Sequence, residues 1–191
     1  MDMQTELGTA GRNWYLEHIL GYKTALRVAF GLIWLIDALL KWTPQFSSNF
    51  ESMIQAAMVG QPSSLMPWFN FWANVTSVNP YAFAFIIALV ETLLALAVLF
   101  GFMRKVTYLL GAVFSLFLWT IPDAFGGFYI PGATDIGASI IYFVVFLFLI
   151  LVNGAFGPSK YSIDHLIEKR YKSWRRVAEF NPTASAVVKK N

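Results

Sequence analysis

The chain has 191 residues, of which 57% are hydrophobic and only 13% are charged, and its formal net charge is +3. A soluble domain carries about 25% charged residues, so this composition indicates an integral membrane protein. The sequence contains no cysteine, which excludes disulfides, thiolate catalysis, iron–sulfur clusters and cysteine-based zinc sites within it. Its two histidines, His18 and His165, show no ligand spacing, and we predict no metal or haem in this chain.

The first expected span covers about residues 23–42 and follows a cytoplasmic or interfacial N-terminal segment, residues 1–22, that ends in a short interfacial helix. The apolar part of the span is nineteen residues long, which is about 28 Å as a helix and close to the thickness of a bilayer's hydrocarbon core. It nevertheless contains Arg27, Asp37 and Lys41. A charge that faces lipid costs at least about 2.5–3.5 kcal/mol at mid-bilayer, so we expect these side chains to face protein, water, a ligand or the interface. Asp37 and Lys41 are four residues apart, so they share a helix face and can pair.

The segment after the first span, residues 46–79, is too polar to cross a membrane and too aromatic to be a free linker. It contains NFESMIQAAMVG, which has the pattern of a short amphipathic helix, and a crowded aromatic group of Trp68, Phe69, Phe71 and Trp72. Amphipathic aromatic side chains settle at the depth of lipid headgroups. We therefore expect an interfacial, aromatic-rich loop that acts as a lid.

Three more apolar segments predict spans at about 81–100, 106–121 and 135–152. Together with the first span they predict an all-α membrane protein, in which residues 23–155 form a four-helix transmembrane bundle. Residues 156–191 follow as a basic tail with an amphipathic helix. Because this tail adjoins a span, its expected partner is anionic membrane lipid rather than nucleic acid.

The distribution of basic residues predicts the orientation of the four spans. Of the 14 lysines and arginines, 13 lie in three regions: the N-terminal region with the inner end of span one, the 101–105 turn and the C-terminal region. The two loops on the opposite side hold none. The remaining basic residue is Lys41. The positive-inside rule then places both termini in the cytoplasm.

The outer half of the predicted bundle collects the residues from which a binding site could be built. Charged residues there are Asp37, Lys41, Glu51, Asp123 and Asp135, and aromatic candidates are Trp34, Trp42, Trp119, Tyr129 and Tyr142. Such a pocket could hold a quinone headgroup, since a carboxylate can exchange its proton and aromatic side chains can stack against its ring. It could instead hold a small anion against Lys41, or the charges could pair only with each other to fix helix register.

Glu91 is the most isolated charge, near the middle of the second span. As a functional residue it would be a proton relay or a partner of Arg27. As a structural residue it would be protonated and donate one hydrogen bond to a neighbouring helix, because desolvation disfavours the charged form of a carboxyl group. Both readings remain open from the sequence.

Three segments together resemble one family of membrane proteins: GLIWLIDALLKWTPQF, ETLLALAVLFGFMRKVTYLLGAVFSLFLW and FGGFYIPGATDIGASIIYFVVFLFL. Their order and spacing are similar to the DoxX/DoxD-like membrane proteins, most closely the DoxD-type small subunit of thiosulfate:quinone oxidoreductase. The resemblance covers roughly residues 23–155. Its most specific part is a W-x-x-D-x-x-L-K-x-x-P pattern, formed here by Trp34, Asp37, Leu40, Lys41 and Pro44, with support from Glu91, Gly101 and Arg104.

The resemblance implies a four-helix subunit in the plasma membrane of a prokaryote. In the thiosulfate enzyme such a subunit works with a second, DoxA-type subunit, oxidises thiosulfate to tetrathionate and passes electrons to membrane quinone. On that basis we predict Asp37, Lys41 and Glu91 as catalytic residues. We also predict that thiosulfate binds at Lys41. The predicted quinone-binding residues are Arg27, Trp34, Trp119, Asp123, Asp135 and Tyr142. Other relatives are accessory proteins, so a non-catalytic subunit of a larger respiratory or oxidase complex is the alternative, and a small anion or proton transporter is a third hypothesis.

Overall fold

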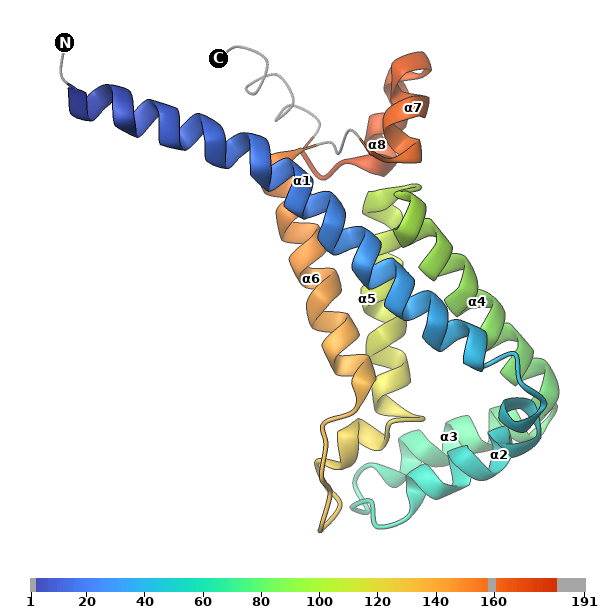
Figure 1. Ribbon diagram of the computed structural model, residues 1–191. Coiled ribbons are helices and arrows are strands. Elements are labelled where there is room, and N and C mark those ends of the chain that lie inside the picture. The colour runs from blue at the N-terminus through green and yellow to red at the C-terminus, as the bar shows by residue number, and fades with distance from the viewer. Residues whose placement is uncertain (1–2, 158–160, 182–191) are drawn as a thin grey trace.

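The computed structural model describes residues 3–157 and 161–181, and over these residues the chain is all-helical (Figure 1). The four longest helices build a bundle: α1 (Met3–Leu40), α4 (Pro80–Phe100), α5 (Arg104–Thr120) and α6 (Ala138–Phe156). Two helices lie at one end of it, which we call the α2–α3 end: α2 (Pro44–Met58) and α3 (Met66–Ser77). The opposite end, here the tail end, carries α7 (Ile163–Arg170) and α8 (Arg175–Ala178). Short 3-10 turns complete the order: η1 (Ala124–Gly127) and η2 (Lys172–Trp174).

The helix boundaries follow from local sequence signals. Pro44 occupies the first turn of α2, where its missing N–H costs no hydrogen bond. Asn79 caps α4, because its side chain accepts a hydrogen bond from the backbone N–H of Ala82 at 3.1 Å. Gly101 ends α4 in the left-handed conformation at φ 65°. A Cβ at this position would lie 2.7 Å from the Cβ of Ser162, so the turn needs glycine for space as well as for conformation.

Three predicted boundaries are corrected by the structure. The short interfacial helix expected within residues 1–22 is part of one continuous helix, α1, which has 38 residues and extends beyond the bundle at the tail end (Figure 1). The lid expected at 46–79 as a loop with one short amphipathic helix contains two helices: α2 confirms the helix expected within 49–60, and α3 is additional. The helix expected from residue 135 begins at Ala138, so Asp135 precedes it.

The bundle is organised as two helix pairs, since the most extensive contacts join α1 to α4 and α5 to α6. Small residues allow both approaches. A Cβ at Gly31 would lie 2.8 Å from the Cα of Leu99, and one at Gly111 would lie 2.2 Å from the ring of Phe146. Between the pairs lies an aromatic core in which Trp34 and Phe146 are fully buried, with ring centroids 5.0 Å apart.

Two helices of the described chain, α4 and α6, are long and apolar enough to cross a membrane. Their most apolar windows have mean hydropathies of 2.7 and 2.5, yet only 33% and 22% of those windows are buried. The apolar side chains therefore point mainly outward, which is the opposite of a buried core helix in a soluble protein. Helix α5, at 17 residues, is about 25 Å long, and α1 carries Arg27 and Asp37 within its apolar part.

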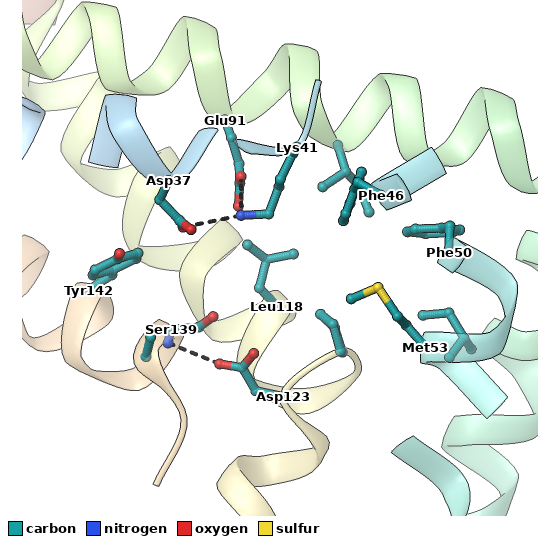
Figure 2. A pocket seen from close by; sticks show the side chains of 14 residues that line it. Asp37, Lys41, Phe46, Phe50, Met53, Glu91, Leu118, Asp123, Ser139 and Tyr142 are labelled. Carbon is teal, nitrogen blue, oxygen red and sulfur yellow. Dashed lines mark hydrogen bonds and ion pairs between the residues drawn. The ribbon is translucent and has the colours of Figure 1, made fainter. Parts of the chain in front are cut away.

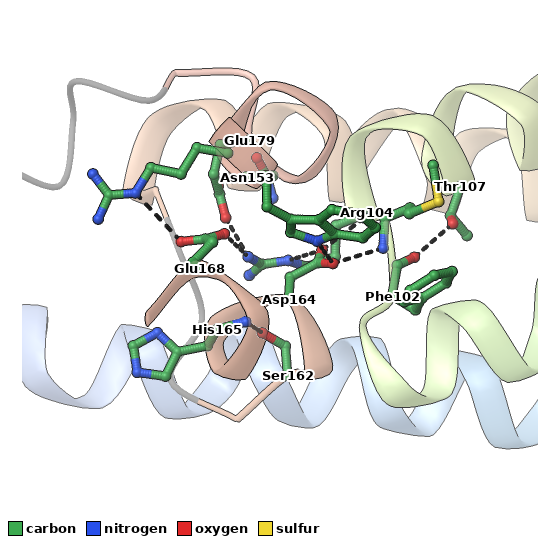
Figure 3. Close-up of polar contacts among 12 residues, drawn as sticks. Phe102, Arg104, Thr107, Asn153, Ser162, Asp164, His165, Glu168 and Glu179 are labelled. Carbon is green, nitrogen blue, oxygen red and sulfur yellow. Dashed lines mark hydrogen bonds and ion pairs between the residues drawn. The ribbon is translucent and has the colours of Figure 1, made fainter. Parts of the chain in front are cut away.

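The tail is a compact cap rather than the single amphipathic helix expected from the sequence (Figure 3). It is held by Arg104, at the start of α5, whose side chain is fully buried. The guanidinium contacts three buried carboxylates of the tail, those of Asp164, Glu168 and Glu179. Asp164 also accepts hydrogen bonds from the backbone N–H groups of Met103 and Arg104, at 2.8 and 2.9 Å. The tail is therefore not one continuous basic helix: it consists of α7, η2 and α8, and its three acidic side chains face inward.

Candidate functional site

A cavity of about 170 Å³ lies inside the bundle near the α2–α3 end (Figure 2). Its walls come from five elements, because α1, α4, α5 and α6 converge there and α2 closes one side. The polar lining residues are Asp37, Lys41, Glu91, Asp123, Ser139 and Tyr142. The apolar lining residues are Phe46, Phe50, Met53, Ile54, Ile87, Leu118, Pro122 and Ala138. The cavity is thus an apolar chamber with charged groups gathered in part of its wall.

Three charged side chains, which we call the charged series, lie in contact from the rim of the cavity to its interior. Lys41 Nζ lies 3.1 Å from Asp37 Oδ2 and 2.7 Å from Glu91 Oε2. The exposed fraction falls along this series, from 37% for the side chain of Asp37 to 19% for Lys41 and 0% for Glu91. Figure 2 shows the lysine between the two carboxylates. Asp37 lies in the last turn of α1, Lys41 directly follows that helix, and α4 supplies Glu91, so the arrangement depends on the close packing of α1 on α4.

Glu91 is the most constrained of the three groups. Glu91 Oε2 lies 2.7 Å from Lys41 Nζ in an ion pair, and Glu91 Oε1 has no hydrogen-bond partner within the described part of the chain. A buried carboxylate oxygen without a donor is costly, since its desolvation is not compensated. A bound group that donates to this oxygen, or a proton on it, would remove that cost.

The wall formed by α5 and α6 adds a second acidic group. Asp123, just after α5, accepts a hydrogen bond from the backbone N–H of Ser139 at 3.0 Å and thereby caps the first turn of α6. Tyr142 stands one turn further along α6 and also lines the cavity. Three carboxylates therefore face the cavity against the single ammonium of Lys41. This balance of charge disfavours a dianion and suits a neutral ligand that exchanges protons.

The structure brings together five of the predicted site residues, namely Asp37, Lys41, Glu91, Asp123 and Tyr142. The other four do not line the cavity. Trp34 is buried in the aromatic core beneath it, Trp119 donates its Nε1–H to the carbonyl of Ile136 at 2.9 Å, and Asp135 accepts from the backbone N–H of Gly137 at 2.8 Å. These three therefore shape the protein around the cavity.

Arg27 is the fourth residue outside the cavity, and it does not form the pair with Glu91 that the sequence leaves as one alternative. Its guanidinium lies at the tail end, where it donates to the carbonyls of Val98, Leu99 and Tyr161, each at 2.6 Å. The first two carbonyls belong to the last turn of α4, where the regular backbone hydrogen bonds of the helix end, so Arg27 caps that helix and ties the tail to it. Glu91 is instead paired with Lys41.

The sequence reasoning missed the four α2 residues of the wall, Phe46, Phe50, Met53 and Ile54. Their spacing of three or four residues is that of one helix face, and this signal was present in the amphipathic stretch of residues 49–60. The sequence pattern alone favours the lipid interface for this face, whereas in the structure the face packs against the bundle. Helix α2 is therefore a wall of the cavity and not only a surface lid.

No protein-family model matches the chain, and comparisons with characterised proteins and with solved structures return no similar protein.

Proposed function

We propose that this chain is a membrane subunit of a quinone-linked redox complex and that the cavity binds the quinone headgroup. The observation that carries the proposal is the buried Glu91, paired with Lys41 and with one oxygen unpartnered, at the wall of an otherwise apolar chamber. Buried polar groups that converge on an apolar pocket are the usual mark of a ligand site.

The size of the cavity supports a small ring as its occupant. A cavity of about 150 Å³ in a protein core accommodates benzene, and this one has about 170 Å³. Phe46 and Phe50 of α2 supply aromatic faces for a planar ligand, and Lys41 can donate to a carbonyl oxygen. A long isoprenoid tail would not fit inside and would remain in the lipid.

The charged series supplies the proton that quinone reduction requires. A quinone becomes a quinol by taking up two electrons and two protons, and an acid within hydrogen-bond reach must supply each proton. Glu91 lies inside the cavity and Asp37 at its rim, with Lys41 in contact with both. With both carboxylates ionised, the proton to be transferred is on the ammonium group of Lys41, and Asp37 at the rim can return a proton from outside to Lys41 after each transfer. The electrons come from a partner, either a DoxA-type subunit or another member of a respiratory complex.

The membrane placement is part of the same proposal. We propose four spans, formed by α1, α4, α5 and α6, with both termini in the cytoplasm of a prokaryote, as the basic residues and the DoxX/DoxD-like motifs predict. The outward apolar faces of α4 and α6 support this placement. Thiosulfate at Lys41 is less well supported than quinone, because two carboxylates already contact that ammonium group.

The test is the affinity of the purified protein for the quinol form of a short-chain analogue, whose hydroxyl groups can donate a hydrogen bond to Glu91. Glu91→Gln keeps the shape of the side chain and removes its charge, and a hydrogen bond to a charged group contributes about 1.5–3 kcal/mol. We expect this variant to bind about tenfold or more weakly. The matched control is Glu51→Gln, the same change at an exposed position on α2, which should bind as the wild type does.

A second candidate is a non-catalytic accessory subunit, and one observation favours it. Lys41 is already neutralised by Asp37 and Glu91, which is the arrangement expected of a purely structural ion pair. In that case Glu91→Gln would lower the thermal stability and the wild type would show no saturable binding of the quinone analogue. The transporter hypothesis gains no argument from the geometry, because Trp34 and Phe146 fill the interior below the cavity.

A further inference from the structure

The tail segment, residues 161–181, separates its charges in space. Its sequence contains five basic and three acidic residues, which is close to balance. In the folded tail, however, the three acidic side chains are all buried: Asp164, Glu168 and Glu179. The surface of the tail is therefore far more positive than its sequence indicates.

Arg104 is the cause of this separation, and it comes from α5 rather than from the tail (Figure 3). Its Nε lies 3.0 Å from Asp164 Oδ2, and its terminal nitrogen contacts Glu168 at 3.4 Å and also Glu179. Trp174 donates its indole N–H to Asp164 at 2.8 Å. One buried guanidinium thus withdraws three carboxylates from the solvent side.

Four basic side chains remain exposed, and we call them the basic face: Lys169, Arg170, Lys172 and Arg176. The fifth basic residue of the segment, Arg175, lies 3.6 Å from Glu168. Exposed apolar side chains are interspersed with the basic residues in the sequence of the tail, with Leu166 64% exposed and Tyr171 57% exposed. A surface that mixes lysine and arginine with exposed aromatic and aliphatic groups is typical of binding to a membrane interface.

The tail is fixed close to the end of the bundle by backbone hydrogen bonds. The carbonyl of Tyr161 accepts from Arg27 at 2.6 Å, and the backbone N–H of Asp164 donates to the carbonyl of Gly101 at 3.2 Å. Helix α6 ends at Phe156, only a few residues earlier in the chain. If the bundle spans a bilayer, the basic face lies at headgroup depth.

We propose that the basic face is a binding site for the headgroups of anionic phospholipids in the adjacent leaflet. This inference rests on the membrane placement given under the proposed function, but not on the quinone site. Each basic side chain near an anionic bilayer surface strengthens association about fivefold, and no acidic side chain of the described tail is exposed to oppose the four of the basic face. Leu166 and Tyr171 add apolar contact with the upper part of the acyl region.

The experiment compares lipid binding by native mass spectrometry of the full-length protein released from mixed micelles. Phosphatidylglycerol and phosphatidylcholine with the same acyl chains are the two probes. We expect the wild type to retain phosphatidylglycerol at least tenfold more strongly than phosphatidylcholine. A variant with all four basic residues replaced, K169Q/R170Q/K172Q/R176Q, should lose that preference, and high salt should weaken it in the wild type.

The matched control exchanges the four residues while keeping their charge, as K169R/R170K/K172R/R176K. It should bind phosphatidylglycerol within about threefold of the wild type, because the interaction depends on charge near the surface. Equal retention of the two lipids by the wild type overturns the proposal, as does an unchanged preference in the glutamine variant. Binding of a soluble acidic protein without any lipid preference would also overturn it. The quinone-analogue assay on the same variants is independent, because none of the four lines the cavity.

Discussion

Replacing Arg104 by methionine should release the tail from the bundle while leaving the bundle folded. The substitution keeps the approximate length of the side chain and removes the only cation that contacts Asp164 and Glu179 within the described residues. All three carboxylates around it are buried. Removal of one partner from a buried ion pair costs about 3–5 kcal/mol, because the remaining charge is left uncompensated.

This loss is large for a cap of about twenty residues. Since about 1.4 kcal/mol corresponds to a tenfold change in an equilibrium constant, the ratio of docked to undocked tail should fall by about a hundredfold to several thousandfold. Hydrogen exchange measured by mass spectrometry is the assay. Amide groups of residues 161–181 should exchange at least a hundredfold faster in Arg104→Met, whereas those of α4 and α6 should change little.

The neighbouring substitution Lys105→Met is the control. Lys105 stands over the ring of Phe180 at 5.8 Å, a contact that contributes about 0.5–1 kcal/mol at a partly exposed site. Its effect on exchange in the tail should therefore be less than tenfold. If Arg104→Met leaves tail exchange at the wild-type rate, or if Lys105→Met has the larger effect, the assignment of the tail's stability to Arg104 is refuted.

Further predictions concern pH and close packing. Burial raises the pKa of Glu179 from 4.5 to about 7, so the folded form binds this proton more tightly than the unfolded form. The contribution of the protonated group to the stability of the folded form is full below about pH 4.5 and is lost as the pH rises to about 7. The stability of the wild-type tail should fall by up to about 3 kcal/mol over this window, and thermal denaturation at a series of pH values should show a smaller slope for Glu179→Gln. Gly111→Ala should cost about 1–3 kcal/mol through its clash with the ring of Phe146, and the double variant with Phe146→Leu should recover part of the loss in melting temperature. Gly31→Ala should destabilise by a similar amount because its Cβ meets the backbone of α4, whereas Gly21→Ala, with nothing within 4 Å, should not lower the melting temperature.

The sequence was sufficient for contacts that repeat with the period of a helix. The Asp37–Lys41 pair follows from a spacing of four residues, and the structure confirms it at 3.1 Å. The all-helical class follows from the long apolar segments and from the pattern of 49–60. Local rules of this kind depend only on the geometry of one element.

The contacts that the sequence did not predict are contacts between elements. Periodicity within one helix does not determine them. Glu91 pairs with Lys41 rather than with Arg27 because α1 crosses α4 at a position that only tertiary packing determines. In the sequence, Arg104 is a basic residue of a short turn and supports the family resemblance, but neither signal predicts its contacts, since its three partners lie 60, 64 and 75 residues further along the chain. The prediction that the tail binds membrane lipid therefore depends only on its total charge. The sequence does not show that the acidic side chains are buried, which makes the surface of the tail more basic.

The central claim is that the cavity between α1, α2, α4, α5 and α6 holds a quinone headgroup. A photoreactive short-chain quinone, irradiated with the purified protein and located by peptide mass spectrometry, tests it most directly. We predict crosslinks to the cavity wall, above all to Phe46, Met53 and Tyr142, that are suppressed by excess unlabelled analogue. Crosslinks confined to the exposed faces of α4 and α6, with no suppression, would contradict the claim.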